Sequence, residues 1–217
     1  MSSLIFHTDE KQVFAATDTL AVTPDGTPFF FTTKAFVVPH LRMIMAGTGA
    51  GGFLDRWFIS VNQMIVRGVD DLKHCTPESL QKLWVEFRKA YSFPDDFTTT
   101  VYHFGFSEIT GVINSYAYRS TNNFRSEPLQ YGLAIKPECT VPDNYRLPHD
   151  LKSMMDEQRA IQRSRPAGDQ LYIGGEIYVH HLMEGGSNVY RLDRFDDYEQ
   201  DRETIYTNLL ARKFGRS

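Results

Sequence analysis

The chain has 217 residues, of which 41% are hydrophobic and 23% are charged, and its formal net charge is −4. This length and composition are typical of a globular protein with one domain and a sizeable core. No basic run is visible, which argues against a nucleic-acid partner. Neither a long apolar stretch nor a signal peptide with a basic start is visible, which argues against a membrane partner.

The first part of the chain predicts an antiparallel sheet. Two β-rich runs, residues 4–7 and 12–22, flank a polar segment and are expected to form a hairpin. A turn follows at Pro24-Asp25-Gly26, where proline presets φ and glycine accepts a positive φ. Two further strands are expected at residues 29–38 and 41–46. Tight turns between successive strands favour antiparallel pairing.

A glycine-rich segment, residues 47–52, joins the last of these strands to a helix. Its sequence satisfies the G-x-G-x-x-G pattern of a dinucleotide-binding turn. That fold requires a parallel strand after the helix, whereas a second helix is expected here. The segment also suits an oxyanion-binding backbone N–H at Gly47, or a turn that only permits close packing. The sequence leaves all three interpretations open.

The remainder of the chain alternates between helices and strands. Residues 53–66 have apolar side chains at helical spacing, and a second such helix begins with a threonine cap and a proline at Thr76-Pro77-Glu78. The further elements expected in chain order are strands at 97–107, 112–119 and 131–135 with a loop at 120–130, a helix at 150–163, and a hairpin of 171–183 with 187–194. This order predicts an α+β fold.

Three polar residues in the first strands suggest a chemistry. Ser2 becomes the first residue if Met1 is removed, Asp18 follows sixteen positions later, and Lys34 sixteen positions after that. An N-terminal hydroxyl is a nucleophile whose own α-amine takes its proton, because the intrinsic pKa of that amine is about 8. A lysine nearby lowers the free energy of the alkoxide.

At these residues the sequence resembles the proteasome β-type family of N-terminal nucleophile (Ntn) hydrolases. The matching positions are Ser2, Ala16-Thr17-Asp18, Lys34 and Ala46-Gly47, and the resemblance covers about the first 65 residues. The nucleophile departs from that family, being serine rather than threonine, so the chain would be a divergent member of bacterial or phage type. The resemblance implies a four-layer αββα sandwich, with two antiparallel sheets between helices.

The resemblance also implies a domain plan and roles for the matching residues. Residues 1–217 would form a single Ntn-hydrolase-like domain, with residues 195–217 as a terminal helix or tail. Ser2 would be the nucleophile, Lys34 its electrostatic activator, Asp18 the partner that orients the lysine, and Gly47 the oxyanion donor.

The supporting residues of such a site match less well. Active members of the family carry an aspartate and a serine before the Gly-Gly of a late strand, and a further serine in the middle of the chain. Asp169 is the nearest acid here, one position out of step, and Ile173 stands where the first serine would be. Ser126 is the stand-in for the second serine.

We therefore expect a hydrolase that cuts amide bonds, in a peptide substrate, with Ser2 as the nucleophile. A non-catalytic structural or assembly subunit of the same fold is the alternative, and a dinucleotide-binding enzyme that uses the glycine segment is a second one. The resemblance implies a homo-oligomer, in the form of a ring. The sequence does not indicate whether an ATPase partner exists.

No cofactor and no metal ion are expected. His180 and His181 are adjacent on a strand, so their side chains point to opposite faces. The acidic run at residues 196–201 lacks the glycine of a calcium-binding loop. Cys75 and Cys139 form no Cys-x-x-Cys pair, which favours a reducing, cytoplasmic compartment.

Overall fold

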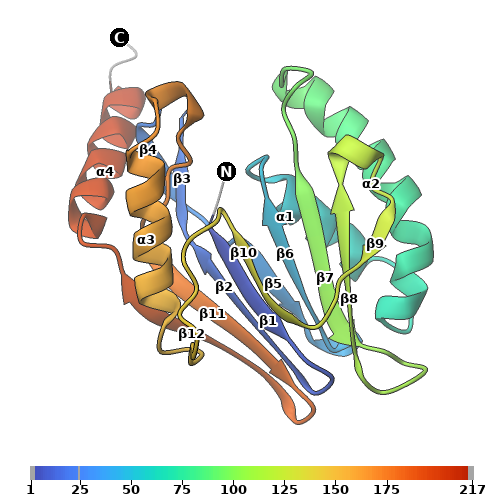
Figure 1. The fold of residues 1–217 in the computed structure, drawn as a ribbon. Coiled ribbons are helices and arrows are strands. Elements are labelled where there is room, and N and C mark those ends of the chain that lie inside the picture. The colour runs from blue at the N-terminus through green and yellow to red at the C-terminus, as the bar shows by residue number, and fades with distance from the viewer. Residues whose placement is uncertain (1–2, 24, 215–217) are drawn as a thin grey trace.

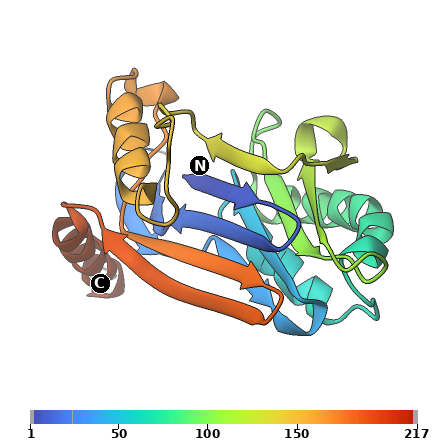
Figure 2. The same cartoon turned by 60° about the horizontal axis from the view of Figure 1, so that its bottom comes forward.

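A computed structural model describes residues 3–23 and 25–214. Two five-stranded sheets face each other, and all strand pairs among the described residues are antiparallel. Helices cover the outer face of each sheet, so the molecule has four layers (Figure 1). Figure 2 shows the two helical layers on opposite flanks of the paired sheets. The predicted αββα sandwich is therefore confirmed.

The first sheet contains the chain's opening hairpin at its centre. Its strands, in the order β10-β1-β2-β11-β12, are Gly132–Lys136, Leu4–Thr8, Gln12–Asp18, Glu176–Met183 and Gly186–Arg194. The second sheet runs β5-β6-β7-β8-β9, with bounds Ala35–Val38, Met43–Thr48, Thr100–Phe106, Ile113–Arg119 and Ser126–Pro128. A separate hairpin pairs β3 (Leu20–Val22) with β4 (Pro28–Phe31).

Helices α1 (Phe53–Asn62) and α2 (Val69–Tyr91) lie on the second sheet, and α3 (Leu151–Arg163) and α4 (Tyr198–Phe214) lie on the side of the first (Figure 1). Three buried apolar clusters correspond to the three contacts between the layers. One joins α1 and α2 to the second sheet, one lies between the sheets, and one joins α3 to the first sheet. The burial of these apolar side chains is the main force that holds the layers together. None of the described helices is long and apolar enough to span a membrane.

The start of α2 differs from the prediction. The helix begins at Val69, seven residues before the expected cap at Thr76, and Pro77 lies inside it. The carboxylate of Glu108 accepts hydrogen bonds from the backbone N–H groups of Asp70 and Asp71, which have no partner within the helix. A distant residue therefore caps this helix, and the local pattern did not reveal it.

Two strand predictions also need correction. The single strand expected at residues 29–38 is two strands, β4 and β5, separated by Thr32–Lys34. The loop expected at residues 120–130 contains β9, which pairs with β8. In this pairing Ser126 lies opposite Tyr118. The break between β4 and β5 matters most, because Lys34 lies in it rather than within a strand.

The glycine segment does not lead into a dinucleotide-binding fold. After β6 the chain passes through α1 and α2 and returns in β7, which pairs antiparallel with β6. A dinucleotide-binding fold requires a parallel strand at this point. The glycines instead make the strand-to-helix turn, with Gly52 at the N-cap of α1 in a left-handed conformation, φ 81°. This topology overturns the dinucleotide interpretation.

Candidate active site

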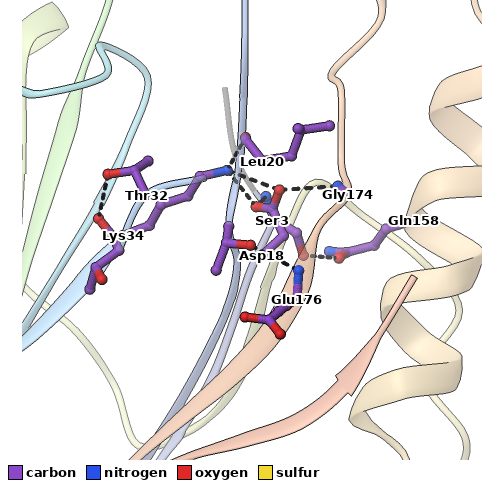
Figure 3. Close-up of polar contacts among 10 residues, drawn as sticks. Ser3, Asp18, Leu20, Thr32, Lys34, Gln158, Gly174 and Glu176 are labelled. Atoms are coloured by element: carbon purple, nitrogen blue, oxygen red, sulfur yellow. Dashed lines mark hydrogen bonds and ion pairs between the residues drawn. The ribbon is translucent and has the colours of Figure 1, made fainter. Parts of the chain in front are cut away.

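The site is built around a buried ion pair between Asp18 and Lys34. Asp18 is the last residue of β2, and Lys34 immediately precedes β5. The Lys34 Nζ atom lies 2.9 Å from each carboxylate oxygen of Asp18, and the two side chains are 8% and 0% exposed. The structure thus brings together two of the residues that the sequence singled out (Figure 3).

Every donor and acceptor of this pair is used. Lys34 Nζ also donates to the carbonyl oxygen of Leu20, at 2.6 Å, so its three N–H groups have three acceptors. The Asp18 carboxylate additionally accepts from the backbone N–H of Ser3, at 2.9 Å, and of Gly174, at 3.2 Å. Four N–H groups therefore donate to one buried carboxylate.

Burial lowers the pKa of the Lys34 ammonium, while the charge of Asp18 and their hydrogen bond act in the opposite direction. Since the ammonium and the carboxylate are neighbours in a buried site, each compensates for the lost hydration of the other. The arrangement provides a fixed positive charge at the start of β1, where a developing negative charge could be stabilised.

Ser3, the first described residue, is held from two sides. Its N–H is bonded to Asp18, and its fully buried hydroxyl donates to Gln158 Oε1 on α3 at 2.5 Å. The side-chain amide of Gln158 in turn donates to the carbonyl oxygen of Pro137. This network ties the start of β1 to α3 and to the segment that follows β10.

Two glycines allow the chain to approach Asp18 closely. The carbonyl oxygen of Gly174 accepts from the N–H groups of Thr19 and Leu20, and its own N–H donates to Asp18. Gly175 has φ 81°, and a Cβ atom there would lie 2.4 Å from Thr19 Oγ1. That hydroxyl accepts from the N–H of Glu176, at 2.8 Å. A Gly-Gly within the strand expected at residues 171–183 is a sequence signal of such a close backbone approach, or of a bulge.

The remaining residues proposed from the sequence are Ser2, Gly47, Asp169 and Ser126. Ser2 and Met1 lie outside the described residues. The Gly47 N–H donates to the carbonyl oxygen of Lys34, at 3.1 Å. That bond engages the N–H and argues against its assignment as an oxyanion donor.

The two stand-ins for supporting residues lie elsewhere in the fold. Asp169 is exposed, at the end of a short 3₁₀ turn. Ser126 lies on β9, the edge strand of the second sheet, whereas Asp18 belongs to the first sheet. Among the described residues, no hydrogen bond or ion pair joins either one to Asp18 or Lys34. Ser3 and Gly174 donate to Asp18 instead, and Gln158 holds Ser3. The sequence pointed to neither Ser3 nor Gln158.

No metal centre accompanies this site in the part of the chain that the structure describes, where no group of three or more His, Cys, Asp or Glu side chains could hold an ion. His180 is buried, and its pKa is lowered to about 4 by that burial. His181 stacks on Phe14 with ring centroids 3.9 Å apart. Packing within the fold therefore accounts for both histidine side chains.

An αββα sandwich of this kind has the Ntn-hydrolase-like fold, and solved structures share it. They are described as Anbu, an ancestral β-subunit. The protein from Yersinia bercovieri has a TM-score of 0.58 at 11% identity, over 100% of this chain and 98% of that one. The helical assembly of the Anbu complex from Pseudomonas aeruginosa has a TM-score of 0.64 at 12% identity, over 99% and 96%. Anbu from Hyphomicrobium sp. strain MC1 has a TM-score of 0.55 at 13% identity, over 99% and 97%.

These comparisons correct the family suggested by the sequence. No protein-family model matches the chain, and no curated protein matches it. The solved structures named above that share its fold are described as Anbu, an ancestral β-subunit, rather than as proteasome β subunits. At 11–13% identity the likeness establishes the fold alone.

Proposed function

We propose that this chain is an Ntn-type hydrolase that cleaves amide bonds in peptides, with Ser2 as the nucleophile after removal of Met1. The observation that carries the proposal is the bond between the Ser3 N–H and the Asp18 carboxylate, next to Lys34 Nζ. The peptide bond joins Ser2 to this same nitrogen. The residue whose hydroxyl would react therefore directly precedes a residue whose backbone N–H is hydrogen-bonded to the buried ion pair.

The chemistry follows from these groups. The Ser2 hydroxyl attacks the carbonyl carbon of the substrate, and its proton passes to the free α-amine of the same residue. The amine then gives the proton to the leaving nitrogen, and an ester to Ser2 remains. Water attacks the ester, again with the α-amine as base, and releases the acid product. The positive charge of Lys34 lowers the free energy of the anionic intermediates, and Asp18 holds that charge in place.

We also propose that the chain assembles with copies of itself. The Anbu protein of Pseudomonas aeruginosa, with a TM-score of 0.64, is described as a helical assembly. Its fold covers 99% of this chain, which supports a similar packing of subunits. Light scattering of the purified protein tests this part, and a monomer at micromolar concentration would contradict it.

A non-catalytic subunit of the same fold is the second candidate. Three observations favour it: the engaged N–H of Gly47, the exposed position of Asp169, and the placement of Ser126 in the other sheet. In that case the Asp18–Lys34 pair would serve stability alone. The two candidates differ in whether Ser2 reacts.

The deciding experiment is mass spectrometry of the intact protein before and after treatment with a peptide epoxyketone. This probe requires both a hydroxyl and a free amine on the same N-terminal residue. The hydrolase predicts a chain that begins at Ser2 and gains one probe on it, together with cleavage of quenched peptides that Ser2→Ala abolishes. Ser187→Ala, on the exposed strand β12, is the matched control and should keep full activity. A chain that retains Met1 and cleaves nothing would leave only the non-catalytic subunit.

A further inference from the structure

We infer that Lys136 and Arg119 form an anion-binding subsite beside the proposed nucleophile, which selects peptides with an acidic side chain next to the cleaved bond. This inference rests on the proposed hydrolase and specifies its substrate class. Both cations belong to the inner faces of the sheets, at the end where β2 and β6 finish. Figure 1 shows the two sheets splayed apart at that end.

Lys136 reaches across from the first sheet to the second. It lies directly opposite Leu4 in the pairing of β10 with β1, so the two side chains share a face. Leu4 belongs to the apolar cluster between the sheets. Lys136 Nζ accordingly donates to the hydroxyl of Thr48, at the end of β6 in the second sheet, at 3.2 Å. Its ammonium therefore lies between the two sheets.

Arg119 approaches the same point from the second sheet. It is the last residue of β8, and its Nε donates to Glu127 at 2.9 Å. Burial raises the pKa of the neighbouring Tyr102 hydroxyl, and contacts with Arg119 and Thr48 act in the opposite direction. Thr48 is hydrogen-bonded to Lys136 and is also a neighbour of Tyr102, which Arg119 contacts. Lys136 and Arg119 therefore have neighbours in common.

Lys136, Arg119 and Glu127 together carry one more positive charge than negative charge. Glu127 pairs with Arg119, whereas no ion pair involves Lys136 within the described ranges 3–23 and 25–214. Burial lowers the pKa of Lys136, and the positive charge of Arg119 lowers it further. A half-buried ammonium with a second cation nearby and no acid of its own gains stability when an anion binds. A carboxylate fits, since both cations donate hydrogen bonds that match its oxygens.

The subsite lies next to the proposed reaction centre. Leu4, opposite Lys136, follows Ser3, and Ser3 is bonded to Asp18. Thr48, its hydrogen-bond partner, follows Gly47, which is bonded to Lys34. Neighbouring strands lie about 4.8 Å apart, so the backbone of Lys136 lies beside that of Leu4 at the start of β1. An aspartate or glutamate beside the cleaved bond spans that distance.

The test compares quenched peptides that differ only in Asp or Asn at the residues flanking the cleaved bond. We expect kcat/KM to be about tenfold higher for the Asp peptide, which is the size of one favourable charged contact. Lys136→Met should reduce the ratio to about one, and Lys136→Arg should retain most of it. Lys82→Met removes the same charge from an exposed helix position and should leave the ratio unchanged. Equal cleavage of both peptides by the unaltered protein would overturn the subsite and leave the hydrolase intact.

A binding measurement separates this inference from the proposed reaction. Ser2→Ala lacks the nucleophile under either view of the protein, and its binding of fluorescein-labelled Asp and Asn peptides is followed by polarisation. Tighter binding of the Asp peptide that Lys136→Met abolishes would support the subsite even if the protein hydrolyses nothing. Binding that does not distinguish the two peptides, or that survives Lys136→Met, would refute it.

Discussion

Lys34 Nζ lies 2.9 Å from both carboxylate oxygens of Asp18, and neither side chain has appreciable contact with solvent. The two residues are 16 positions apart and end up in contact because β2 finishes at one and β5 begins after the other. Breaking such a pair from one side leaves the other charge buried and uncompensated. The pair is therefore a structural requirement whether or not the chain is catalytic.

Removing one member of this pair should be costly. Asp18→Asn and Lys34→Met are each expected to lower the free energy of unfolding by about 3–5 kcal/mol, measured by urea denaturation. The double variant should lose less than the sum, because neither charge is then left alone. Strictly additive losses, or single losses below about 1 kcal/mol, would show that the pair is not buried as described.

Replacing Gln158 should affect both the stability of the fold and the reactivity of the N-terminus. Gln158→Leu leaves the buried Ser3 hydroxyl and Pro137 carbonyl without their partner, at a cost of about 1–3 kcal/mol in unfolding free energy. If Ser2 reacts as proposed, its labelling by the epoxyketone should also slow. Gln63→Leu changes an exposed glutamine in the same way and serves as the control. Identical melting temperatures of both variants and the parent would contradict this role.

The sequence predicted the elements whose signals are local. The alternating runs before and after the polar turn identified the hairpin of β1 and β2, and the helical spacing identified α1 and α3. The start of α2 was wrong because Glu108, 38 positions from Asp70, provides its cap. No window of neighbouring residues contains that information.

The residues of the site likewise include some that the sequence predicted and some that it did not. Asp18 and Lys34 were found because a resemblance supplied their spacing, and the Gly-Gly at 174–175 because glycines in a strand indicate a close approach. Gln158 gave no signal, since it sits on a helix 155 positions from Ser3 and looks like any helical glutamine. Buried polar partners that meet only through tertiary packing are not visible in a single sequence.

Gly175 should not tolerate a side chain. Its φ of 81° disfavours any other residue, and the added Cβ would meet Thr19 Oγ1 at 2.4 Å. Gly175→Ala is therefore expected to lose about 1–3 kcal/mol of unfolding free energy. Gly185→Ala is a close control, because a Cβ there meets nothing within 4 Å. Equal stability of the two variants in urea would contradict the tight contact.

Two buried histidines should make the fold sensitive to acid. Burial lowers the pKa of His103 to about 3 and that of His180 to about 4. Below the unfolded-state pKa of about 6.5 the unfolded chain binds more protons, so stability falls as the pH decreases from there. Each histidine is expected to remove about 2 kcal/mol between pH 6.5 and pH 5. His103→Gln keeps an acceptor for the indole N–H of Trp57, 2.8 Å away, and should flatten this dependence.

Asp201 should give the opposite pH dependence, in which the stability of the fold falls as the pH rises. This residue of α4 is 8% exposed, and its Oδ2 has no hydrogen-bond partner among the described residues. Burial, reinforced by the charge of Asp197, raises its pKa to about 6, while Arg159 and Arg163 act in the opposite direction. Between the unfolded pKa of about 3.8 and this value the folded chain binds more protons, so stability falls as the pH rises.

Asp201→Asn should therefore stabilise the protein at neutral and alkaline pH and have little effect at pH 4. The expected gain at pH 8 is about 1–3 kcal/mol in unfolding free energy, because the unfavourable buried charge is absent. Glu203→Gln removes a charge from an exposed position of the same helix and is the matched control. Urea denaturation of the three proteins at pH 4, 6 and 8 measures the difference. A gain that is the same at every pH would mean that Asp201 does not take up a proton on folding.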